Sequence, residues 1–253
     1  MAWNPDVYNQ FKNERYQPFY DLISHIEKRQ HMHVLDLGCG TGELTNHLAE
    51  QLDEATVVGV DNSAEMLSKA PKKDTIVFEE KSIETVLDEE RKWDVIVANA
   101  SLQWIDDHEA LIPKIISRLK PNGQIAIQMP LQSENLLNQL LFNLANQEPY
   151  QSSLQGYNRV SPVLSMDAYA KILFEHQAVA MTIYQKMYPI IAKQQDELFN
   201  FISGSALIPY LEKLNVETAL KFTADFKKSI DQEFPEMPAI YAFKRIILHA
   251  KFN

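Results

Sequence analysis

Short apolar segments alternate with stretches of helical periodicity along the first half of the chain. The predicted strands are His33–Leu37, Thr56–Val60, Ile76–Glu80, Trp93–Asn99 and Gln124–Met129. The predicted helices between them are Glu43–Gln51, Ala64–Ala70, Ile83–Glu89 and His108–Leu119. This alternation predicts right-handed βαβ units and a mostly parallel sheet with helices on both faces.

The pattern changes after residue 130. Helical periodicity covers residues 134–146, 165–176, 196–203 and 216–233, strands are expected at 179–191 and 245–252, and a polar loop at 147–162. Two late strands that are separated by about fifty residues of helical pattern indicate an insertion that caps the sheet. The predicted fold class is therefore α/β, a doubly wound, mostly parallel, seven-stranded sheet with a helical cap in the C-terminal half.

Three alternating glycines follow the first predicted strand. The segment V-L-D-L at 34–37 leads directly into G-C-G-T-G at 38–42, and a helix is expected from Glu43. Backbone N–H groups in such a turn can approach a ligand closely, because a Cβ on these residues would block the approach. The second predicted strand ends at Asp61, where an acid can accept both hydroxyls of a ribose. Together these features predict a nucleoside-bearing cofactor.

The spacing of the glycines distinguishes between cofactors. A dinucleotide fingerprint reads G-x-G-x-x-G and seats a pyrophosphate, whereas this chain has G-x-G-x-G with Asp36 two residues before it. A carboxylate there would repel a pyrophosphate but could hold an ammonium group. S-adenosyl-L-methionine has an ammonium and a sulfonium and no phosphate, so it is the predicted cofactor. A nicotinamide-dependent reductase and a structural turn without a ligand remain alternatives.

Several segments resemble known methyltransferases. V-L-D-L-G-C-G-T-G and V-G-V-D-N-S-A-E-M-L resemble the first two motifs of class I methyltransferases, which have a Rossmann-like sheet. W-N-P-D-V-Y-N-Q-F-K-N-E-R at 3–15, N-A-S-L-Q-W at 99–104 and Q-M-P at 128–130 resemble the narrower family of trans-aconitate 2-methyltransferases. This resemblance implies methyl transfer from S-adenosyl-L-methionine to a carboxylate of a small polycarboxylic acid such as trans-aconitate.

The resemblance and the predicted strand ends together assign candidate site residues. The expected cofactor-binding residues are Asp36, Gly38, Gly40, Gly42, Asp61, Asn62, Met66, Ser82, Ile83, Asn99 and Tyr8. The residues expected to position the methyl acceptor are Asn99, Ser101, Gln103 and Trp104. The residues expected to bind the substrate are Arg15, Arg159, Tyr210 and Arg245. The corresponding parts are a helical lid at 1–30, a cofactor-binding core at 31–132, and a cap with the last two strands at 133–253.

Two positions depart from the pattern of this family. Ser82 occupies the end of the third strand, where an acid that meets the adenine amino group is usual, although a serine can still accept that hydrogen bond. Ile208 occupies the place of an arginine in a segment that usually reads G-L-R-P-[WY]-L. Another small carboxylate, or the free acid end of an acyl thioester, therefore remains an alternative substrate, and a cofactor-binding module without catalysis remains an alternative function.

Composition excludes several other classes. The net charge of −10 and the lack of a long Lys/Arg cluster argue against nucleic acid, and the fourth strand ends in N-A-S-L rather than in the D/N-P-P-aromatic run of amino-methyltransferases. The sequence has no apolar run of 18 residues and no basic segment followed by an apolar stretch at its start, so neither a membrane span nor a signal peptide is expected. Cys39 is the single cysteine, which suits the cytoplasm, and we expect a small anionic substrate and a monomer or weak dimer.

No metal and no general base are expected. His108, His176 and His249 are scattered without the spacing of metal ligands. A carboxylate acceptor is already ionised at neutral pH, since the unperturbed pKa of such a group is near 4. The chain therefore needs residues that align the acceptor and exclude water rather than a catalytic His–Asp pair.

Overall fold

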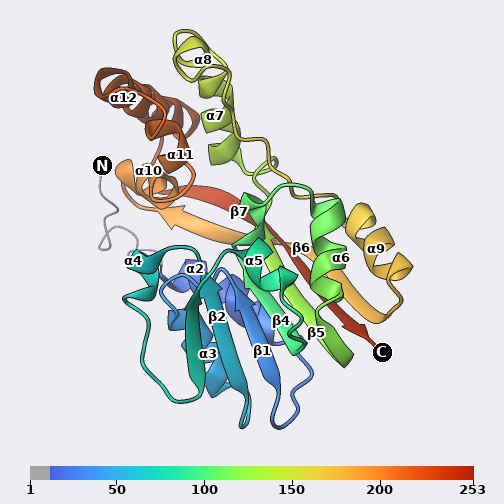
Figure 1. Ribbon diagram of the computed structural model, residues 1–253. Helices are drawn as coiled ribbons and strands as arrows, with labels where there is room; N and C mark the ends of the chain where they lie inside the picture. The colour runs from blue at the N-terminus through green and yellow to red at the C-terminus, as the bar shows by residue number, and fades with distance from the viewer. Residues whose placement is uncertain (1–11) are drawn as a thin grey trace. The chain divides into compact units, whose positions relative to one another are not determined.

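The computed structural model, which describes residues 12–253 and side chains from residue 16 onward, contains a seven-stranded sheet (Figure 1). The strand order is β3-β2-β1-β4-β5-β7-β6. The strands are β1 (His33–Leu37), β2 (Thr56–Asp61), β3 (Ile76–Glu80), β4 (Trp93–Asn99), β5 (Leu119–Pro130), β6 (Ala178–Ala192) and β7 (Ala239–Phe252). This order confirms the predicted doubly wound α/β sheet.

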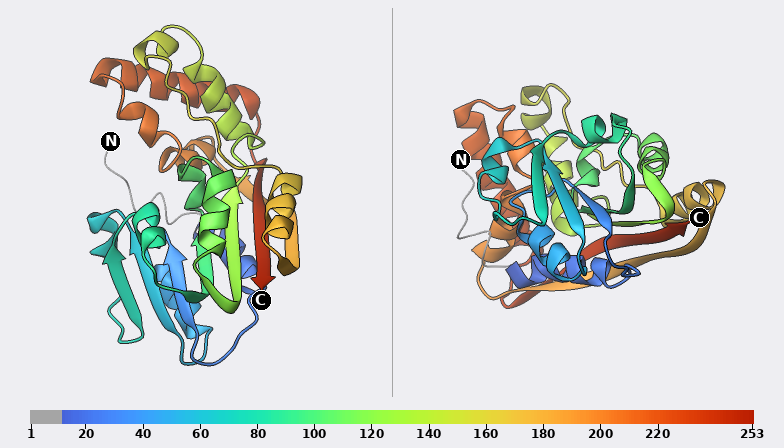
Figure 2. Two further views of the ribbon diagram at one scale, coloured as in Figure 1. Left: turned by 45° about the vertical axis from the view of Figure 1, so that its right-hand side comes forward. Right: turned by 60° about the horizontal axis from the view of Figure 1, so that its bottom comes forward.

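Helices connect the strands and cover both faces of the sheet (Figures 1 and 2). The helices are α2 (Lys12–Ile23), α3 (Glu43–Glu50), α4 (Ala64–Leu67), α5 (Ile83–Asp88), η1 (Leu102–Trp104), α6 (His108–Ile116), α7 (Leu136–Ala145), α8 (Tyr150–Ser153), α9 (Met166–Glu175), α10 (Asp196–Ser203), α11 (Ile208–Leu211) and α12 (Val216–Glu233). Within the described range, no helix combines the length and apolar character that crossing a membrane requires.

The register of the strands places their carboxyl ends at one edge. Strands β1 to β5 pair in parallel, whereas β7 runs antiparallel to β5 with Gln128 opposite Ile247. The chain leaves β1 for β2 on one side and later returns to β4 on the other side. The loops after β1 and β4 therefore flank the switch point of the sheet, which is where open α/β sheets bind ligands.

Several element boundaries differ from the sequence prediction. Strand β7 begins at Ala239 rather than at Arg245, and β5 extends back to Leu119 through the expected turn. Two short helices, α8 and α11, form in segments where none was predicted. Tyr150 and Tyr210 anchor these one-turn helices, because each side chain is almost fully buried, and tertiary packing of this kind outweighs weak local periodicity.

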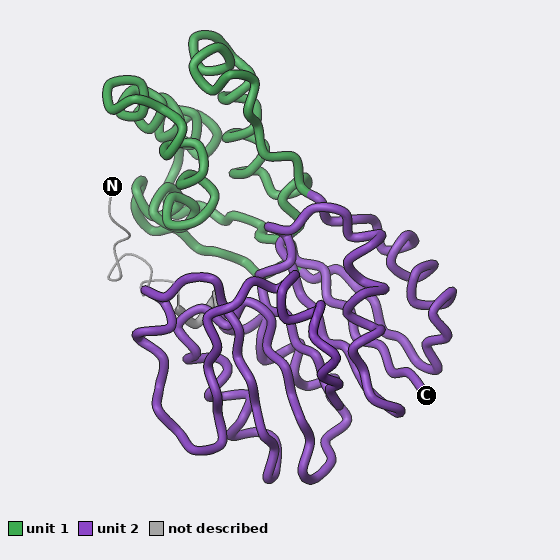
Figure 3. The backbone as a smooth tube through the Cα atoms, viewed as in Figure 1, with its two compact units in different colours: residues 1–15, 131–161, 187–244 green, residues 16–130, 162–186, 245–253 purple. Residues whose placement is uncertain are grey.

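The chain divides into two compact units (Figure 3). Unit 1 consists of residues 1–15, 131–161 and 187–244, and unit 2 consists of residues 16–130, 162–186 and 245–253. Both β6 and β7 contain residues of each unit. Unit 2 contains β1 to β5 and the loops that follow β1, β2, β3 and β4.

Each unit has its own apolar core. In unit 2, α2 and α3 pack on alternating residues of the sheet, so that one face is buried by Phe19, Leu22, Leu48, Val34, Val57, Val95, Val97, Ala126 and Ile247. In unit 1, the helices bury aromatic side chains that include Tyr150, Phe201, Tyr210, Phe222, Phe226, Tyr241 and Phe243. Tyr150 and Phe222 pack edge to face with their ring centroids 4.9 Å apart, a geometry that aromatic pairs favour.

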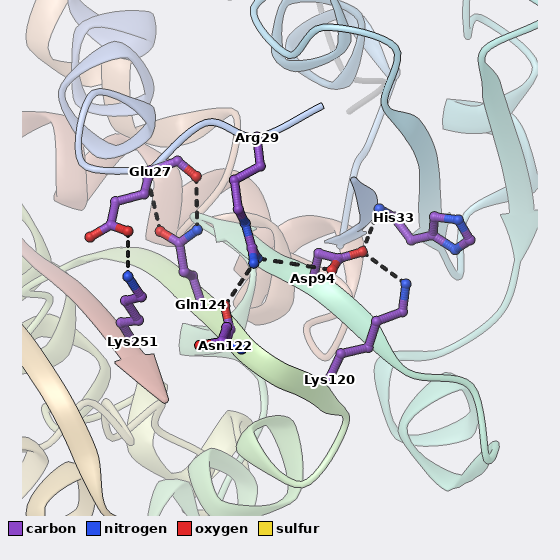
Figure 4. A network of polar contacts seen from close by, with 8 residues as sticks. All are labelled: Glu27, Arg29, His33, Asp94, Lys120, Asn122, Gln124 and Lys251. Atoms are coloured by element: carbon purple, nitrogen blue, oxygen red, sulfur yellow. Dashed lines mark hydrogen bonds and ion pairs between the residues drawn. The ribbon is translucent and has the colours of Figure 1, made fainter. Parts of the chain in front are cut away.

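Charged contacts close the opposite edge of the sheet in unit 2 (Figure 4). Asp94, at the start of β4, accepts hydrogen bonds from the His33 backbone N–H and from Lys120 Nζ, each at 2.8 Å. Burial opposes the ionisation of Asp94, but the Lys120 hydrogen bond and the His33 N–H outweigh it and lower the pKa of this carboxyl. The amino ends of β1 and β4 are thus held together by a partly buried carboxylate.

Gln124, at the same edge, is bound by the segment before β1 (Figure 4). Its Nε2 donates to the Glu27 carbonyl oxygen at 3.0 Å, and its Oε1 accepts from the Glu27 N–H at 2.9 Å. The same Oε1 lies 3.1 Å from His249 Nε2. Gln124 therefore has a structural role that is remote from the carboxyl ends of the strands.

Candidate functional site

The glycine loop after β1 adopts left-handed backbone conformations. Gly38, Gly40 and Gly42 have φ angles of +73°, +57° and +69°. A Cβ on Gly38 would lie 2.4 Å from Ser101 Cβ, and a Cβ on Gly42 would lie 2.5 Å from the Phe78 ring. Two of the glycines are thus required by the packing of the protein itself, in addition to any ligand.

Gly40 is different, because a Cβ there would meet only Met66 Sδ at 3.6 Å, which is an ordinary contact. The open side of the loop is therefore at Gly40. The N–H groups of Gly38 and Cys39 both donate to the Val60 carbonyl oxygen, at 2.8 and 2.9 Å. These bonds fix the loop against the end of β2.

Asp61 lies at the carboxyl end of β2 and links two turns. Its Oδ2 accepts from the Gly40 N–H and its Oδ1 from the Ser63 N–H, both at 2.9 Å. The carboxylate is part-buried, and its two oxygens have about four lone-pair sites, of which these bonds use two. The remaining sites are compatible with the predicted ribose contact, which stays a prediction.

Asp36 is a buried carboxylate on β1, two residues before this loop. It is 4 % exposed, and the Thr45 hydroxyl of α3 donates to its Oδ2 at 2.6 Å. Burial raises the pKa of Asp36 to about 6, the Thr45 hydrogen bond opposes the shift, and the charge of Asp61 adds to it. A cationic group beside Asp36 would reverse the shift, so this carboxylate suits an ammonium ligand.

Cys39 does not have the properties of a nucleophile. Burial raises the pKa of its thiol, and the nearby carboxylates of Asp36 and Asp61 raise it further. The thiolate is the reactive form of cysteine, and these surroundings disfavour it at neutral pH. It acts as a small side chain within the loop.

The loop after β4 is fastened to the glycine loop. The Ser101 hydroxyl donates to the Leu37 carbonyl oxygen at 2.6 Å. Ala100 has a φ angle of +54°, and its N–H donates to the Gln128 carbonyl oxygen at 2.9 Å. Gln103 Nε2 donates to the Ala100 carbonyl oxygen at 2.7 Å. The structure thus brings Asn99 to Gln103 together with Gly38, in unit 2, as the topology predicts.

The remaining predicted cofactor residues lie around the same loops of unit 2. Asn62 is exposed and Met66 is 39 % exposed, while Ile83 is buried at the start of α5. Ser82 caps α5, and its hydroxyl accepts from the Thr85 N–H at 3.2 Å. Trp104, which was predicted to position the methyl acceptor, is 40 % exposed. Their roles stay predictions.

The predicted substrate residues fall in different units. Arg159 and Tyr210 belong to unit 1, where the Tyr210 hydroxyl accepts from the Arg159 N–H at 3.1 Å and donates to Asn158 at 2.6 Å. Arg245 belongs to unit 2. The side chain of Arg15 lies outside the described residues, as does Tyr8, which was predicted to bind the cofactor rather than the substrate. A joint substrate site formed by Arg15, Arg159, Tyr210 and Arg245 stays a prediction.

Sequence reasoning missed Gln128 as a site residue. It is fully buried, its Oε1 accepts from Arg245 Nη1 at 2.8 Å, and its Nε2 donates to Asn99 Oδ1. Gln128 stood within the Q-M-P segment, but its partner in β7 is 117 residues away in the sequence. The available signal was the sequence Q-I-A-I-Q-M at 124–129, in which Gln124 and Gln128 fall on the same face of β5.

Sequence reasoning also missed the role of His108. Its Nε2 lies 3.0 Å from the Leu102 carbonyl oxygen, and its Nδ1 contacts the hydroxyl of Tyr169 in α9. Because a carbonyl only accepts, Nε2 carries the proton, and Nδ1 accepts from the tyrosine hydroxyl. The Leu164 N–H donates to the same hydroxyl at 3.1 Å. His108 therefore holds η1 in place and is buried within the fold.

No metal centre is found in the part of the chain that the structure describes, since none of its His, Cys, Asp and Glu side chains form a cluster of three that could hold an ion. The predicted chemistry does not require one.

The sequence matches known proteins over nearly its whole length. A family model described as a methyltransferase domain matches residues 8–220. A trans-aconitate 2-methyltransferase from Deinococcus radiodurans is 37 % identical over 258 residues, which cover 99 % of this chain and 98 % of the relative. A protein of the same name from Yersinia pestis is 33 % identical, with 98 % of each chain covered.

Solved structures show a similar fold at low sequence identity. The YcgJ protein of Bacillus subtilis has a TM-score of 0.60 at 14 % identity and covers 94 % of this chain and 99 % of its own. A phosphoethanolamine N-methyltransferase 2 from Haemonchus contortus, solved in complex with S-adenosyl-L-methionine, has a TM-score of 0.54 at 15 % identity. The match covers 94 % of this chain and 52 % of that structure.

Proposed function

Because this chain belongs to the methyltransferase-domain family, we propose that it methylates a carboxylate of a small polycarboxylic acid such as trans-aconitate and so forms a monomethyl ester. The chain is an enzyme whose methyl donor is S-adenosyl-L-methionine. Support for the acceptor comes from full-length relatives that are named trans-aconitate 2-methyltransferase.

The observation that carries the cofactor assignment is the buried carboxylate of Asp36, two residues before the glycine loop on β1. Its raised pKa reflects burial without a compensating positive charge, which an ammonium would supply. Asp61 lies at the neighbouring strand end with acceptor sites for ribose hydroxyls. When bound, S-adenosyl-L-methionine supplies a methyl group activated by a sulfonium.

The residues of this chain would act by positioning. A carboxylate acceptor arrives ionised, so no side chain has to remove a proton. Asn99, Ser101, Gln103 and Trp104 would orient the acceptor beside the glycine loop, and arginine and tyrosine side chains would pair the other carboxylates. Orientation of two bound reactants can contribute about 7–11 kcal/mol toward lowering the barrier, and exclusion of water strengthens the attraction between the two opposite charges.

A screen of carboxylic acids by mass spectrometry tests this proposal. The protein is incubated with S-adenosyl-L-methionine and aconitate isomers, citrate, malonyl and other acyl thioesters, or fatty acids. We expect trans-aconitate to gain one methyl group as an ester that alkali cleaves. Binding of S-adenosyl-L-methionine without turnover of any acid would contradict the proposal and favour a non-catalytic cofactor-binding module.

Ile208 favours a second candidate substrate. In the family that the chain resembles, this segment usually has an arginine at the position of Ile208, which lies at the start of α11. A tricarboxylate would therefore lose one ionic partner there. Another small carboxylate, or the free acid of an acyl thioester, is the alternative acceptor. Methylation of one of these acids in the screen, with trans-aconitate unchanged, would support it.

We also propose a cytoplasmic location and a monomer or weak dimer without nucleic-acid partners. The single cysteine, which cannot form a disulfide within the chain, and the net charge of −10 support these assignments.

A further inference from the structure

A row of three polar side chains crosses the sheet of unit 2 at the carboxyl ends of β4 and β5. Asn99 is paired in register with Gln128, and Gln128 faces Ile247, two residues from Arg245 on β7. Side chains two residues apart on a strand share a face, so all three project to the same side. Gln128 is fully buried and Arg245 is 7 % exposed, whereas Asn99 is only half-buried.

The chemistry of Arg245 fixes the direction of this row. A guanidinium has only donors, so the Gln128 atom that it contacts at 2.8 Å must be the carbonyl oxygen Oε1. The amide nitrogen of Gln128 then faces Asn99, to which it donates. Asn99 must accept with Oδ1, and its own NH₂ group therefore lies on the side of the carboxamide away from Gln128. A buried cation thus determines the orientation of an amide two residues along the row.

We infer that Arg245, acting through Gln128, holds Asn99 with its N–H donor toward the methyl acceptor, and that this orientation selects an anionic oxygen acceptor over an amine. The inference rests on the proposed function. Asn99 ends β4 next to the Ser101 loop, and that loop is bonded to the strand that precedes the glycines. An N–H group stabilises a carboxylate in this position, whereas a carbonyl oxygen there would repel it and would suit an amine. Gln128 and Arg245 are positioning residues in this account.

Gln128→Glu should reverse the direction of the hydrogen bond between residue 128 and Asn99. Arg245 still binds one oxygen of the introduced carboxylate, but the other oxygen can only accept, so Asn99 must rotate and donate to it. The carbonyl oxygen of Asn99 then faces the acceptor. Asn99→Asp also places an oxygen toward the acceptor, because its second carboxylate oxygen takes the place of the NH₂ group. It leaves Gln128 and Arg245 unchanged.

The test measures trans-aconitate binding to the complex of each variant with S-adenosyl-homocysteine by calorimetry, together with KM and kcat for its methylation. We expect both variants to weaken acid binding and raise KM by about ten- to a hundredfold, as for loss of a hydrogen bond to a charged group. Cofactor affinity should fall less than acid affinity in both variants, and the smaller change is expected in Gln128→Glu, because Asn99 is itself an expected cofactor residue. Gln128→Met, which removes the row without reversing it, should raise KM less than Gln128→Glu.

Gln124→Glu is the matched control, because Gln124 is equally buried on the same face of β5 but is bound by Glu27 and His249. It should leave KM unchanged. An unchanged KM in both Asn99→Asp and Gln128→Glu would overturn the inference. A rise in KM in Asn99→Asp alone would also overturn it, provided that Gln128→Glu is folded and can be saturated with cofactor. An equal loss in Gln128→Met and Gln128→Glu would show a structural role only. Failure of the wild-type protein to methylate any acid would instead overturn the proposed function.

Discussion

Gly38 and Ser101 are packed so closely that a single added carbon would separate two strand ends. A Cβ on Gly38 would lie 2.4 Å from Ser101 Cβ, while the Ser101 hydroxyl donates to the neighbouring Leu37 carbonyl oxygen at 2.6 Å. The loops after β1 and β4 therefore fit together before any ligand is considered. Close packing of the backbone and a hydrogen bond both maintain this contact.

Gly38→Ala should unfold the protein more easily and reduce cofactor binding. The left-handed backbone costs about 1–2 kcal/mol for a residue with a side chain, and the clash adds about 1–3 kcal/mol. Thermal unfolding and calorimetry with S-adenosyl-L-methionine measure the two effects. Gly156→Ala is the control, because Gly156 has a φ angle of +75° and its Cβ would meet nothing within 4 Å. Equal destabilisation by the two substitutions would contradict the packing account.

Asp36 should make stability decrease as the pH rises. Its pKa is raised from 3.8 to about 6 in the folded protein, so between these values the folded state holds a proton that the unfolded state has lost. Stability from this group is complete below about pH 4 and is lost as the pH rises through about 6. The shift corresponds to about 3 kcal/mol.

Asp36→Asn removes this dependence, because an amide stays neutral and can still accept from Thr45. Urea unfolding should show the variant more stable than the wild type at pH 7.5, with a smaller difference at pH 4.5. Cofactor binding should be weakened at both pH values. A constant difference in stability between the two pH values would argue against a titrating Asp36.

Asp61→Asn should weaken cofactor binding by about 1.5–3 kcal/mol, the loss expected for hydrogen bonds to a charged group. One of its atoms becomes a donor and faces the N–H of Gly40 or Ser63, so the glycine loop also loses an anchor. Calorimetry with S-adenosyl-L-methionine gives the affinity. Asp74→Asn, at an exposed position before β3, should leave it unchanged. Equal affinity in Asp61→Asn and wild type would rule out the ribose role.

Tyr169→Phe should reduce turnover with little change in cofactor affinity. The substitution leaves His108 Nδ1 and the Leu164 N–H without their shared partner, and loss of such buried bonds costs about 1–3 kcal/mol. The position of η1 then depends on fewer contacts. Tyr184→Phe is the matched control. It removes a hydrogen bond of 3.0 Å between the Tyr184 hydroxyl and His25 Nε2, and neither residue belongs to the loop that contains η1. A similar fall in kcat for both variants would indicate a general loss of stability.

Ile208→Arg should lower the KM for trans-aconitate if the family arginine contacts a substrate carboxylate. Ile208 is half-buried at the start of α11, so a longer side chain can reach solvent from there. Steady-state kinetics with trans-aconitate and with a monocarboxylate separate charge pairing from a general effect. An unchanged KM for both acids would show that this position lies outside the site.

The parts of the site that were predictable from sequence are local. The glycine loop, Asp36 and Asp61 lie within 26 residues of one another along the chain, and each stands at the end of a clearly apolar strand. The Gln128–Arg245 contact was not predictable, because it depends on the register between β5 and β7. The His108–Tyr169 contact likewise depends on how α6 and α9 pack.

The fold shows the same distinction. The alternation of apolar segments with stretches of helical periodicity was sufficient to predict the sheet and the parallel pairing of its first five strands. The predicted start of β7 was six residues too late. Residues 239–243 read A-I-Y-A-F, and their alternation between exposed and buried positions is seen only in the structure. Short helices such as α11 form around one buried tyrosine, which local sequence does not reveal.

The passage of β6 and β7 through both units has a consequence for how this molecule comes apart. The boundaries between the units at 186/187 and 244/245 interrupt strands rather than loops. A break at either point would sever a continuous strand, so neither unit can be excised or exchanged as an independent module. Loss of order in one half is expected to spread along these strands into the other, and a single cooperative melting event should follow.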